Sequence, residues 1–410
     1  GDDTLQDRRA GVSRAICRPP PGCHNECRHH LDTPMTACKP KPFSIEVAQE
    51  TLEGVLARVR AYPWHEMPED GGWSYGTNID YMKELCAYWA DGYDWRASEA
   101  ELNRLPQYTA EVDGLDIHFV HEKGSGAAAR PLLLVHGWPG SFYEFADTVG
   151  RLAHPERFGG DEGDAFDVIV PSLPGFGFSQ KPPKPIGPRR VGTTLGKLME
   201  DVLGYEAYIV QGGDWGSYVA TWMGLERAPR CAAIHLNMMS ALPGGVALET
   251  AEEKAWHKAA RKVWRAENAY FLMQATKPQT LSYAMMDSPV GIAAWIVEKF
   301  DTWSDSGAEG SFGKDRLLTN VMIYVVSRTF NTASWIYRAH VDAGDARLPS
   351  GRRVEVPVGV ASFPREFIPW APRSFIEKGY NVTHWTDMPR GGHFAAFEAP
   401  DLFTDDVRAF

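Results

Sequence analysis

The sequence predicts an α/β fold in which a mostly parallel sheet is flanked by helices and interrupted by a helical insertion. Short apolar runs alternate with helical patterns across residues 108–240, which indicates βαβ units and a parallel sheet. Residues 241–345 are helical and rich in Trp, Tyr and Met, with no strand candidate of comparable strength. Strand patterns return at 354–360 and 382–385. A helical insertion between sheet strands is typical of a cap over an active site.

The bulk composition limits the class of protein. The 410 residues carry a net charge of −11 and are 44% hydrophobic, as in ordinary soluble globular proteins. The negative charge argues against nucleic acid or an anionic membrane surface as the main partner. No apolar stretch approaches the ~20 residues that span a bilayer, and the start lacks the pattern of a signal peptide. We expect a soluble, cytoplasmic protein without a transmembrane anchor, with a homodimer left open.

The first 34 residues differ from the rest of the chain. They are rich in Pro and Arg, lack periodicity and precede Met35. A metal site could be suggested from Cys17, Cys23, Cys27, His29 and His30. Their spacings match no zinc pattern. We interpret residues 1–34 as a disordered leader or extension, and we expect no metal and no cofactor.

Residues 35–107 predict a helical meander. Apolar residues recur at three- and four-residue spacing across 47–59, which indicates an amphipathic helix. A second helix is expected from about Asn78, and a third opens at Asp94 and runs to Leu105. The aromatic residues of this meander are interpreted as packing, and the meander as a brace over the main domain.

The strands of the core are predicted in two parts, residues 108–240 and 346–410. Residues 115–120 alternate at period two, as expected for a half-exposed edge hairpin. Residues 131–135 are wholly apolar and end at His136, as expected for a buried parallel strand. Further strands are expected at 166–170, 208–210 and 231–236.

One turn suggests the chemistry. Gly212-Gly213-Asp214-Trp215-Gly216 reads Gly-x-nucleophile-x-Gly, between an apolar run and a helical pattern. This strand–turn–helix context is the nucleophile elbow of the α/β-hydrolase fold. Glycine is needed on either side, where a Cβ would clash or φ must be positive. An ordinary turn is the alternative, because Gly and Asp are common turn residues.

A second loop could supply the oxyanion hole. His136-Gly137-Trp138-Pro139-Gly140 follows the first wholly apolar strand, where hydrolases of this fold place one N–H donor. The donors would be the backbone amides of Trp138 and Trp215. A simple strand-to-helix turn would also use Gly and Pro, but it leaves His136 unexplained.

The order of the chain selects a base and an acid. Nucleophile, acid and histidine should follow one another, with the histidine near the C-terminus. His393 lies after the last strand, whereas its rival His384 falls inside that strand. Glu366 lies directly beyond strand 354–360 and is the expected acid that orients His393. The weaker competitors are Asp342, Asp345 and Asp387.

An aspartate nucleophile can attack saturated carbon and form an alkyl ester, which a histidine-activated water then hydrolyses. The leaving group could be a halide or the oxygen of an epoxide. An epoxide needs an acid for the opening alkoxide, and pattern alone does not choose among the cap tyrosines Tyr270, Tyr283, Tyr324 and Tyr337. The alternatives are a haloalkane dehalogenase, with side-chain N–H donors for halide, and an inactive ligand carrier.

Several longer motifs are spread along residues 43–410. They include His136-Gly137-Trp138-Pro139-Gly140-Ser141, Gly212-Gly213-Asp214-Trp215-Gly216, Thr276-Lys277-Pro278, Leu317-Leu318-Thr319-Asn320 and Gly391-Gly392-His393-Phe394. Together they make the chain resemble the microsomal-type epoxide hydrolases, including their soluble fungal and bacterial relatives. Two departures are the absence of an anchor helix and a segment, 303–315, that is shorter than in the mammalian enzymes.

The resemblance implies a function and a set of roles. The nucleophile falls on Asp214, the general base on His393, the charge-relay acid on Glu366 and the epoxide-oxygen donors on Tyr270 and Tyr337. It implies hydrolysis of aryl or alkyl epoxides to vicinal diols, a detoxification reaction, with water as the second substrate.

Overall fold

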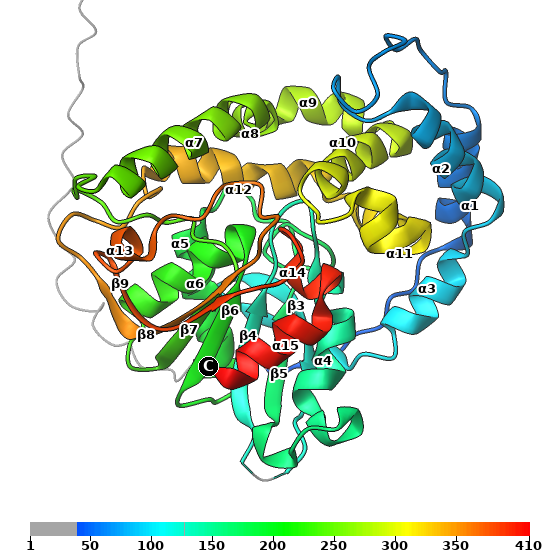
Figure 1. Ribbon diagram of the computed structural model, residues 1–410. Helices are drawn as coiled ribbons and strands as arrows, with labels where there is room; N and C mark the ends of the chain where they lie inside the picture. The colour runs from blue at the N-terminus through cyan, green and yellow to red at the C-terminus, as the bar shows by residue number, and fades with distance from the viewer. Residues whose placement is uncertain (1–38, 127) are drawn as a thin grey trace, which may run out of the picture. The chain divides into compact units, whose positions relative to one another are not determined.

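The structure is a computed structural model that describes residues 39–126 and 128–410. The predicted leader at residues 1–34, with its cysteines and histidines, lies outside the described residues. The core is one sheet, whose strands run in the order β1-β2-β3-β5-β4-β6-β7-β8-β9 (Figure 1). The strands are β1 (Lys41–Pro42), β2 (Gln107–Val112), β3 (Leu115–Glu122), β4 (Arg130–Val135), β5 (Phe166–Pro171), β6 (Tyr208–Gly212), β7 (Cys231–Leu236), β8 (Val354–Ser362) and β9 (Tyr380–Asp387).

The sheet is mostly parallel, as predicted. From β5 to β9 every neighbouring pair of strands is parallel, whereas β1, β2 and β3 pair antiparallel with their neighbours. The apolar side chains of β4 from Leu132 to Val135 have no exposed surface, because helices cover both faces of the sheet.

The prediction of a half-exposed edge hairpin at residues 115–120 is wrong. β3 pairs with β2 on one side and with β5 on the other, so it is not an edge strand. His118 and Val120 have no exposed surface, and the His118 ring contacts Ser172 and Gln107 through hydrogen bonds of 2.9 Å. A polar side chain at an alternate position is therefore buried and satisfied here instead of facing water.

Helices pack on both faces of the sheet. α4 (Ala146–Ala153) contacts α15 (Pro400–Ala409), and α5 (Pro188–Lys197) packs along α6 (Asp214–Glu226). Shorter elements are the 3-10 turns Phe142–Phe145, Pro155–Phe158 and Glu162–Asp164, the π-helical turn Leu198–Val202, α13 (Arg373–Ile376) and α14 (Ala395–Glu398).

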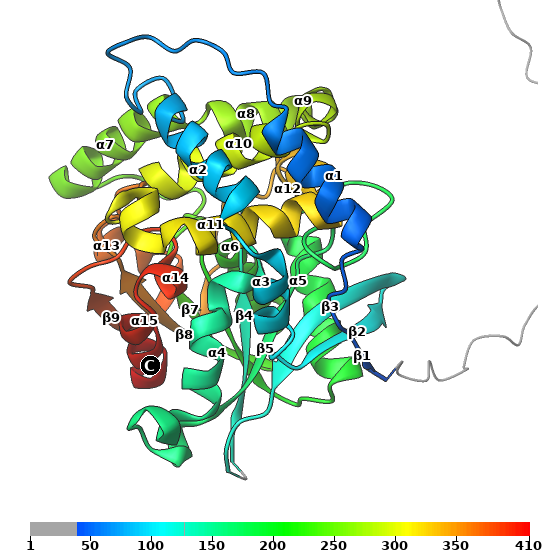
Figure 2. The same ribbon diagram turned by 90° about the vertical axis from the view of Figure 1, so that its right-hand side faces the viewer.

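Six helices of the insertion lie over one end of the sheet (Figures 1 and 2). They are α7 (Ala251–Glu267), α8 (Ala269–Thr276), α9 (Pro278–Met285), α10 (Pro289–Thr302), α11 (Gly307–Ser327) and α12 (Phe330–Ala343). Consecutive helices from α7 to α11 pack on one another, and α12 packs against α8 and α9. The part of the chain predicted to lack strands is accordingly helical.

The N-terminal helices pack on the insertion. α1 (Gln49–Arg60), α2 (Ile79–Asp91) and α3 (Trp95–Leu102) contact α10 or α11 (Figure 2). The Tyr88 hydroxyl donates to the Asp315 carboxylate at 2.7 Å, so part of this contact is polar. The brace therefore meets the helical insertion as well as the sheet, which it joins through β1.

The predicted helix starts are confirmed by their caps. The Asn78 side chain accepts hydrogen bonds from the first amides of α2, and the Asp94 side chain does the same for α3. The packing interpretation of the aromatic residues is confirmed for Trp89, which is buried. It is wrong for Tyr75, which is 71% exposed.

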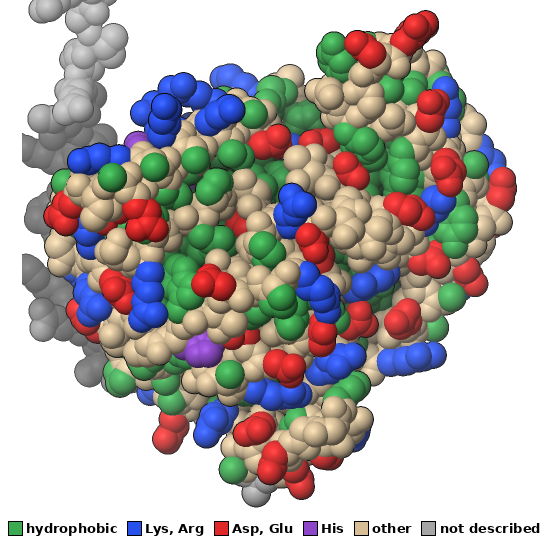
Figure 3. Space-filling model, viewed as in Figure 1, with side chains coloured by type: hydrophobic (Ala, Val, Ile, Leu, Met, Phe, Trp, Pro, Cys, Tyr) green, Lys and Arg blue, Asp and Glu red, His purple; other side chains and the backbone are tan. Residues whose placement is uncertain are grey.

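The face of the molecule in Figure 3 shows no extended field of one charge. Acidic and basic side chains alternate over the face in Figure 3. Within residues 39–126 and 128–410, no helix is long and apolar enough to cross a membrane.

A buried carboxylate joins the end of the sheet to the last helix. Asp406 of α15 lies 2.9 Å from the Nε2 of His235 on β7 and 2.8 Å from the Nε2 of His384 on β9. Burial by itself raises the pKa of Asp406, but the hydrogen bond and the charge of His235 outweigh burial and lower that pKa to about 2. His384, the rival catalytic histidine, is thus engaged in a structural contact.

We expect Asp406→Asn to lower the free energy of unfolding by about 2 kcal/mol at pH 7. The carboxyl has a lower pKa in the folded state than in the unfolded state. Its contribution is therefore complete above pH ~4 and is lost as the pH falls toward 2. Urea denaturation at pH 7, 5 and 3.5 measures the difference from the wild type, which should be constant at the first two values and smaller at the third.

The matched control is Asp405→Asn. Asp405 is the neighbouring residue, has a 74% exposed side chain and pairs only with Arg408 among the described residues. Its substitution should change the free energy of unfolding by less than ~0.5 kcal/mol. Equal effects of the two substitutions would contradict the assignment.

Candidate active site

The turn between β6 and α6 has the strained backbone of a nucleophile elbow. Asp214 adopts a φ of 45°, in the left-handed region that residues with a side chain rarely occupy. This conformation projects the carboxylate from the end of β6 at the first turn of α6.

The flanking glycines are needed for close approach. A Cβ on Gly212 would lie 2.2 Å from the Gly216 carbonyl oxygen, and a Cβ on Gly216 would lie 1.9 Å from the carbonyl oxygen of Val135 on β4. Neither glycine has a positive φ; within the turn that conformation belongs to Asp214. Of the two reasons predicted for glycine, the clash applies and the dihedral angle does not.

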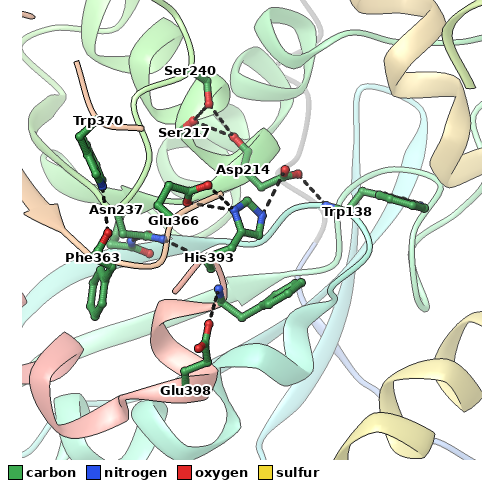
Figure 4. Close-up of polar contacts among 12 residues, drawn as sticks. Trp138, Asp214, Ser217, Asn237, Ser240, Phe363, Glu366, Trp370, His393 and Glu398 are labelled. Carbon is green, nitrogen blue, oxygen red and sulfur yellow. Dashed lines mark hydrogen bonds and ion pairs between the residues drawn. The ribbon is translucent and has the colours of Figure 1, made fainter. Parts of the chain in front are cut away.

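Asp214, His393 and Glu366 form a continuous chain of contacts (Figure 4). The Nε2 of His393 lies 3.4 Å from Asp214 Oδ2, and its Nδ1 lies 3.0 Å from both carboxylate oxygens of Glu366. His393 and Glu366 are buried, with 4% and 8% of their surface exposed. The structure thus brings together the three residues predicted as nucleophile, base and acid.

The charge state of His393 is set by its two carboxylate neighbours. Burial by itself lowers the pKa of His393, but the charge and hydrogen bonds of Glu366 and Asp214 outweigh burial and raise this pKa well above 6.5. An imidazolium between two carboxylates is stabilised as long as both remain charged.

The second predicted loop contacts the other oxygen of the nucleophile. The Trp138 backbone amide donates a hydrogen bond of 2.8 Å to Asp214 Oδ1 (Figure 4). The Trp215 amide lies in the first turn of α6, where backbone N–H groups have no intrahelical acceptor. The Trp138 amide is therefore positioned at the carboxylate as a donor, whereas the role of the Trp215 amide stays a prediction.

His136 has a structural role that the turn alone did not explain. Its Nδ1 contacts the Gly137 carbonyl oxygen at 3.0 Å, and its Nε2 accepts the Leu173 amide at 3.1 Å. Burial lowers the pKa of His136 to about 4, so the ring is neutral and can be both donor and acceptor. It fixes the oxyanion loop to the loop that follows β5.

The environments of the four cap tyrosines differ. Tyr283 is 77% exposed, and the Tyr324 hydroxyl donates to the Gly140 carbonyl oxygen at 2.7 Å. Tyr270 stacks on Trp138 with 5.2 Å between ring centroids, and Tyr337 meets Trp215 edge to face at 4.6 Å. Only the last two lie against the tryptophans that flank the nucleophile.

Both of these hydroxyls are kept protonated. Burial and the charge of Asp214 raise the pKa of Tyr270 and of Tyr337 well above 10. The Tyr337 hydroxyl is buried and has no hydrogen-bond partner among the described residues. A buried donor without a partner is costly, so this group is available to a ligand.

The competing acids lie in other contacts. Asp342 pairs with Arg338 at 2.7 Å and Asp345 lies 3.2 Å from His340. The exposed Asp387 accepts the indole N–H of Trp385 at 3.0 Å. None of these three carboxylates contacts His393, which the buried Glu366 holds through both oxygens.

A halide cradle would need N–H donors at the nucleophile. The indole N–H groups of Trp138 and Trp215 are buried without a partner among the described residues. The same is true of Trp89 and Trp222, which do not line the cavity at Asp214. Unpaired indoles are thus common in this chain and do not single out a halide site.

Two cavities adjoin the catalytic residues. One of about 10 Å³ is bordered by Asp214, His393, Asn237 and Glu144. A larger one of about 310 Å³ has Glu366 and Ser240 in its wall. In the part of the chain that the structure describes, no group of three or more His, Cys, Asp or Glu side chains is arranged to hold a metal ion.

Sequence reasoning missed Glu144 and Asn237. Glu144 is the acid within the apolar turn Phe142–Phe145, directly after the predicted oxyanion loop, and this was the signal that could have identified it. Asn237 follows β7, and its amide accepts the Gln211 amide N–H at 2.6 Å and donates to the His393 carbonyl oxygen at 3.5 Å. No short motif marks Asn237.

Comparison with known proteins gives concordant results. Residues 40–145 match a family described as the epoxide hydrolase N terminus, and residues 130–262 match the alpha/beta hydrolase fold. A Stigmatella aurantiaca protein provisionally named as an epoxide hydrolase is 40% identical over 90% of this chain and 83% of its own length. Epoxide hydrolase 1 of Sus scrofa is 35% identical over 90% and 88%. The Aspergillus niger epoxide hydrolase structure matches with a TM-score of 0.80 and 31% identity, over 91% of this chain and 96% of that one.

We expect Glu366→Gln to lower the pKa of His393, because a neutral amide replaces one of the two carboxylates that raise it. NMR titration of the His393 imidazole measures the shift. Asp387→Asn is the control, since Asp387 is exposed and bonded to Trp385. An unchanged His393 pKa in Glu366→Gln, or an equal decrease in the control, would refute Glu366 as the orienting acid.

Proposed function

The chain belongs to the epoxide hydrolase family and hydrolyses epoxides, and we propose that it does so through a covalent ester on Asp214. This mechanism is supported by the contacts of the Asp214 carboxylate, whose two oxygens have different partners. One oxygen accepts the Trp138 amide and the other faces His393. The nucleophile is thereby held between an oxyanion donor and a base.

In the first step Asp214 attacks the less hindered epoxide carbon from behind. A carbon–oxygen bond forms to the carboxylate as the carbon–oxygen bond of the ring breaks. Tyr270 and Tyr337 hold the departing oxygen and supply its proton, which their raised pKa values support because both hydroxyls are protonated.

The tyrosinate left by the first step regains its proton from the His393 imidazolium. In the second step the neutral His393 removes a proton from water, and the resulting hydroxide attacks the carbonyl carbon of the ester. The departing diol oxygen takes the remaining proton of that water as its bond to the carbonyl carbon breaks. The amides of Trp138 and Trp215 stabilise the oxyanion, and a single donor of this kind contributes roughly 10²- to 10³-fold in rate. The intermediate collapses to the diol and the free carboxylate. Glu366 holds the tautomer of His393 and stabilises the imidazolium.

The larger cavity supports a bulky apolar substituent on the epoxide. Its volume of about 310 Å³ lies at the lower end of the range for small-molecule sites. Its wall includes Trp256, Trp264 and Trp370. Aryl and alkyl epoxides are therefore the proposed substrates, and detoxification is the proposed role.

We propose that residues 241–345 act as a cap, residues 35–107 as a brace, and residues 108–240 and 346–410 as the hydrolase core. We also propose a soluble cytoplasmic enzyme. The net charge of −11 supports solubility, and among the described cysteines Cys86 and Cys231 are free, as expected in a reducing compartment. A homodimer stays a prediction.

A single turnover in ¹⁸O-labelled water should give unlabelled diol and place the label in the Asp214 carboxylate, because water attacks the ester carbonyl. Mass spectrometry of the diol and of the peptide that contains Asp214 measures both products. Labelled diol from the first turnover would exclude the ester. Asp214→Ala, which has no carboxylate, should form no diol.

Tyr270→Phe and Tyr337→Phe should each slow ester formation by roughly 10-fold or more, because each removes a donor to the departing oxygen. Stopped-flow fluorescence under single-turnover conditions measures this rate. Tyr283→Phe is the matched control and should leave it unchanged, since this side chain is 77% exposed. Wild-type ester formation in both cap variants would refute the assignment.

A further inference from the structure

Glu144 is a partly buried acid that the reaction described above does not use. It lies in the turn Phe142–Phe145, directly after the oxyanion loop, among the buried side chains of Phe142, Tyr143 and Phe145. A Cβ placed on Gly140 would lie 1.4 Å from Glu144 Oε1. The Glu144 carboxyl therefore occupies the space that any other residue at position 140 would fill.

This carboxyl borders the small cavity beside the nucleophile. Asp214, His393 and Asn237 border the same cavity of about 10 Å³. That volume corresponds to one water molecule, and a buried water needs two to four polar partners, which this lining supplies. Tyr270 and Tyr337 are not part of the lining, so the cavity lies apart from the proposed donors to the epoxide oxygen.

The electrostatic environment links Glu144 to the catalytic pair. Burial raises the pKa of Glu144 to about 8, the positive charge of His393 opposes this, and the negative charge of Asp214 adds to it. The carboxyl is therefore mostly protonated at neutral pH. In that form it has an O–H donor as well as an acceptor oxygen.

We propose that Glu144 binds the water that hydrolyses the Asp214 ester and holds it in this cavity beside His393. This inference rests on the proposed ester mechanism. The water donates one proton to the Nε2 of His393, and its oxygen forms the new bond to the Asp214 carbonyl carbon. The carboxyl of Glu144 supplies the second contact that fixes the direction of attack. Glu144 is thus a catalytic residue of the second half-reaction only.

The geometry around His393 requires a second hydrogen-bond partner for the water. His393 is already held by Glu366 on its Nδ1 side, so it can offer a water only its Nε2. A single hydrogen bond leaves a water free to rotate about it. Holding the water oxygen in line with the reacting carbon raises the rate of hydrolysis. The entropy cost of orienting the water is then met when the water binds and not during the reaction.

The test separates the two half-reactions in Glu144→Leu, because a glutamine at this position would keep both a donor and an acceptor. Stopped-flow fluorescence gives the rate of ester formation, and quenched-flow mass spectrometry gives the rate of its hydrolysis on Asp214. We expect hydrolysis to slow by about 10-fold or more, equivalent to the loss of one hydrogen bond to a polar group. Ester formation should change by less than ~3-fold, and the ester should accumulate.

Glu398→Leu is the matched control. Glu398 is likewise partly buried, its pKa is raised by burial to about 7, and His393 affects it too. However, its oxygens accept the amides of Asp305 at 2.7 Å and Phe394 at 3.0 Å, and it does not border the cavity. Its substitution should alter stability while leaving the ratio of the two rates unchanged.

Gly140→Ala provides a second variant, because the new methyl group must displace the Glu144 carboxyl. It should reproduce the accumulation of the ester even if Glu144→Leu folds poorly. Equal slowing of both steps, or of neither, in a folded Glu144→Leu would overturn the proposal. If the wild type and every variant form no ester, the ester mechanism itself fails, which is a different outcome.

Discussion

The placement of His393 between two buried carboxylates is the interaction on which the rest of the site depends. Glu366 holds Nδ1 through both of its oxygens and Asp214 faces Nε2. Together they raise the pKa of His393 well above its usual value. In the resting enzyme the ring is therefore a cation that neutralises the nucleophile's charge. Once Asp214 is esterified, that charge disappears and Glu366 alone opposes the effect of burial. The pKa of His393 then falls, and the ring becomes a base at the stage that needs one.

The same requirement explains the strain in the elbow. Asp214 must face an amide on one side and the imidazole on the other, and its positive φ makes this possible. The close approach of Gly216 to the Val135 carbonyl oxygen brings α6 against the end of β4, from which the oxyanion loop begins. The nucleophile and its oxyanion donor thus sit on two adjacent parallel strands, β6 and β4, whose register is fixed by the sheet. A strained residue at a functional site is tolerated because its surroundings determine its conformation.

Most of the fold could be predicted from the sequence, because strands buried on both faces and helices with one apolar face leave clear periodic patterns. The parallel strands, the helical insertion and the caps at Asn78 and Asp94 follow from such local signals. Exposure is not a local property, and this explains the errors. The alternation at residues 115–120 did not reveal that β5 pairs on the far side of β3, where His118 is buried. Likewise Tyr75 is aromatic but projects into solvent.

The same difference between local and non-local properties explains which residues of the site could be predicted. Residues in motifs with a fixed order, such as Asp214 and His393, could be placed from the chain alone. The separation of Tyr270 and Tyr337 from Tyr283 and Tyr324 depended on resemblance, because nothing in the local pattern distinguishes a bonded or exposed hydroxyl from a free one. The position of Glu144 directly after the predicted oxyanion loop was a local signal, but its place at the cavity depends on the space that Gly140 leaves, which only the structure shows.

Two cavities of very different size, the smaller bordered by Asp214 and the larger by Glu366, suggest how the two proposed half-reactions are kept apart. The larger cavity meets the catalytic residues through Glu366 and Ser240, and its aromatic lining suits an apolar substituent. The smaller has room for a single water beside Asp214 and His393. An epoxide cannot enter a space of that size, and a water held there approaches the carboxyl group without displacing the alkyl chain. Keeping the water separate from the substrate allows both to be in place before the ester forms, so hydrolysis needs no opening of the cap.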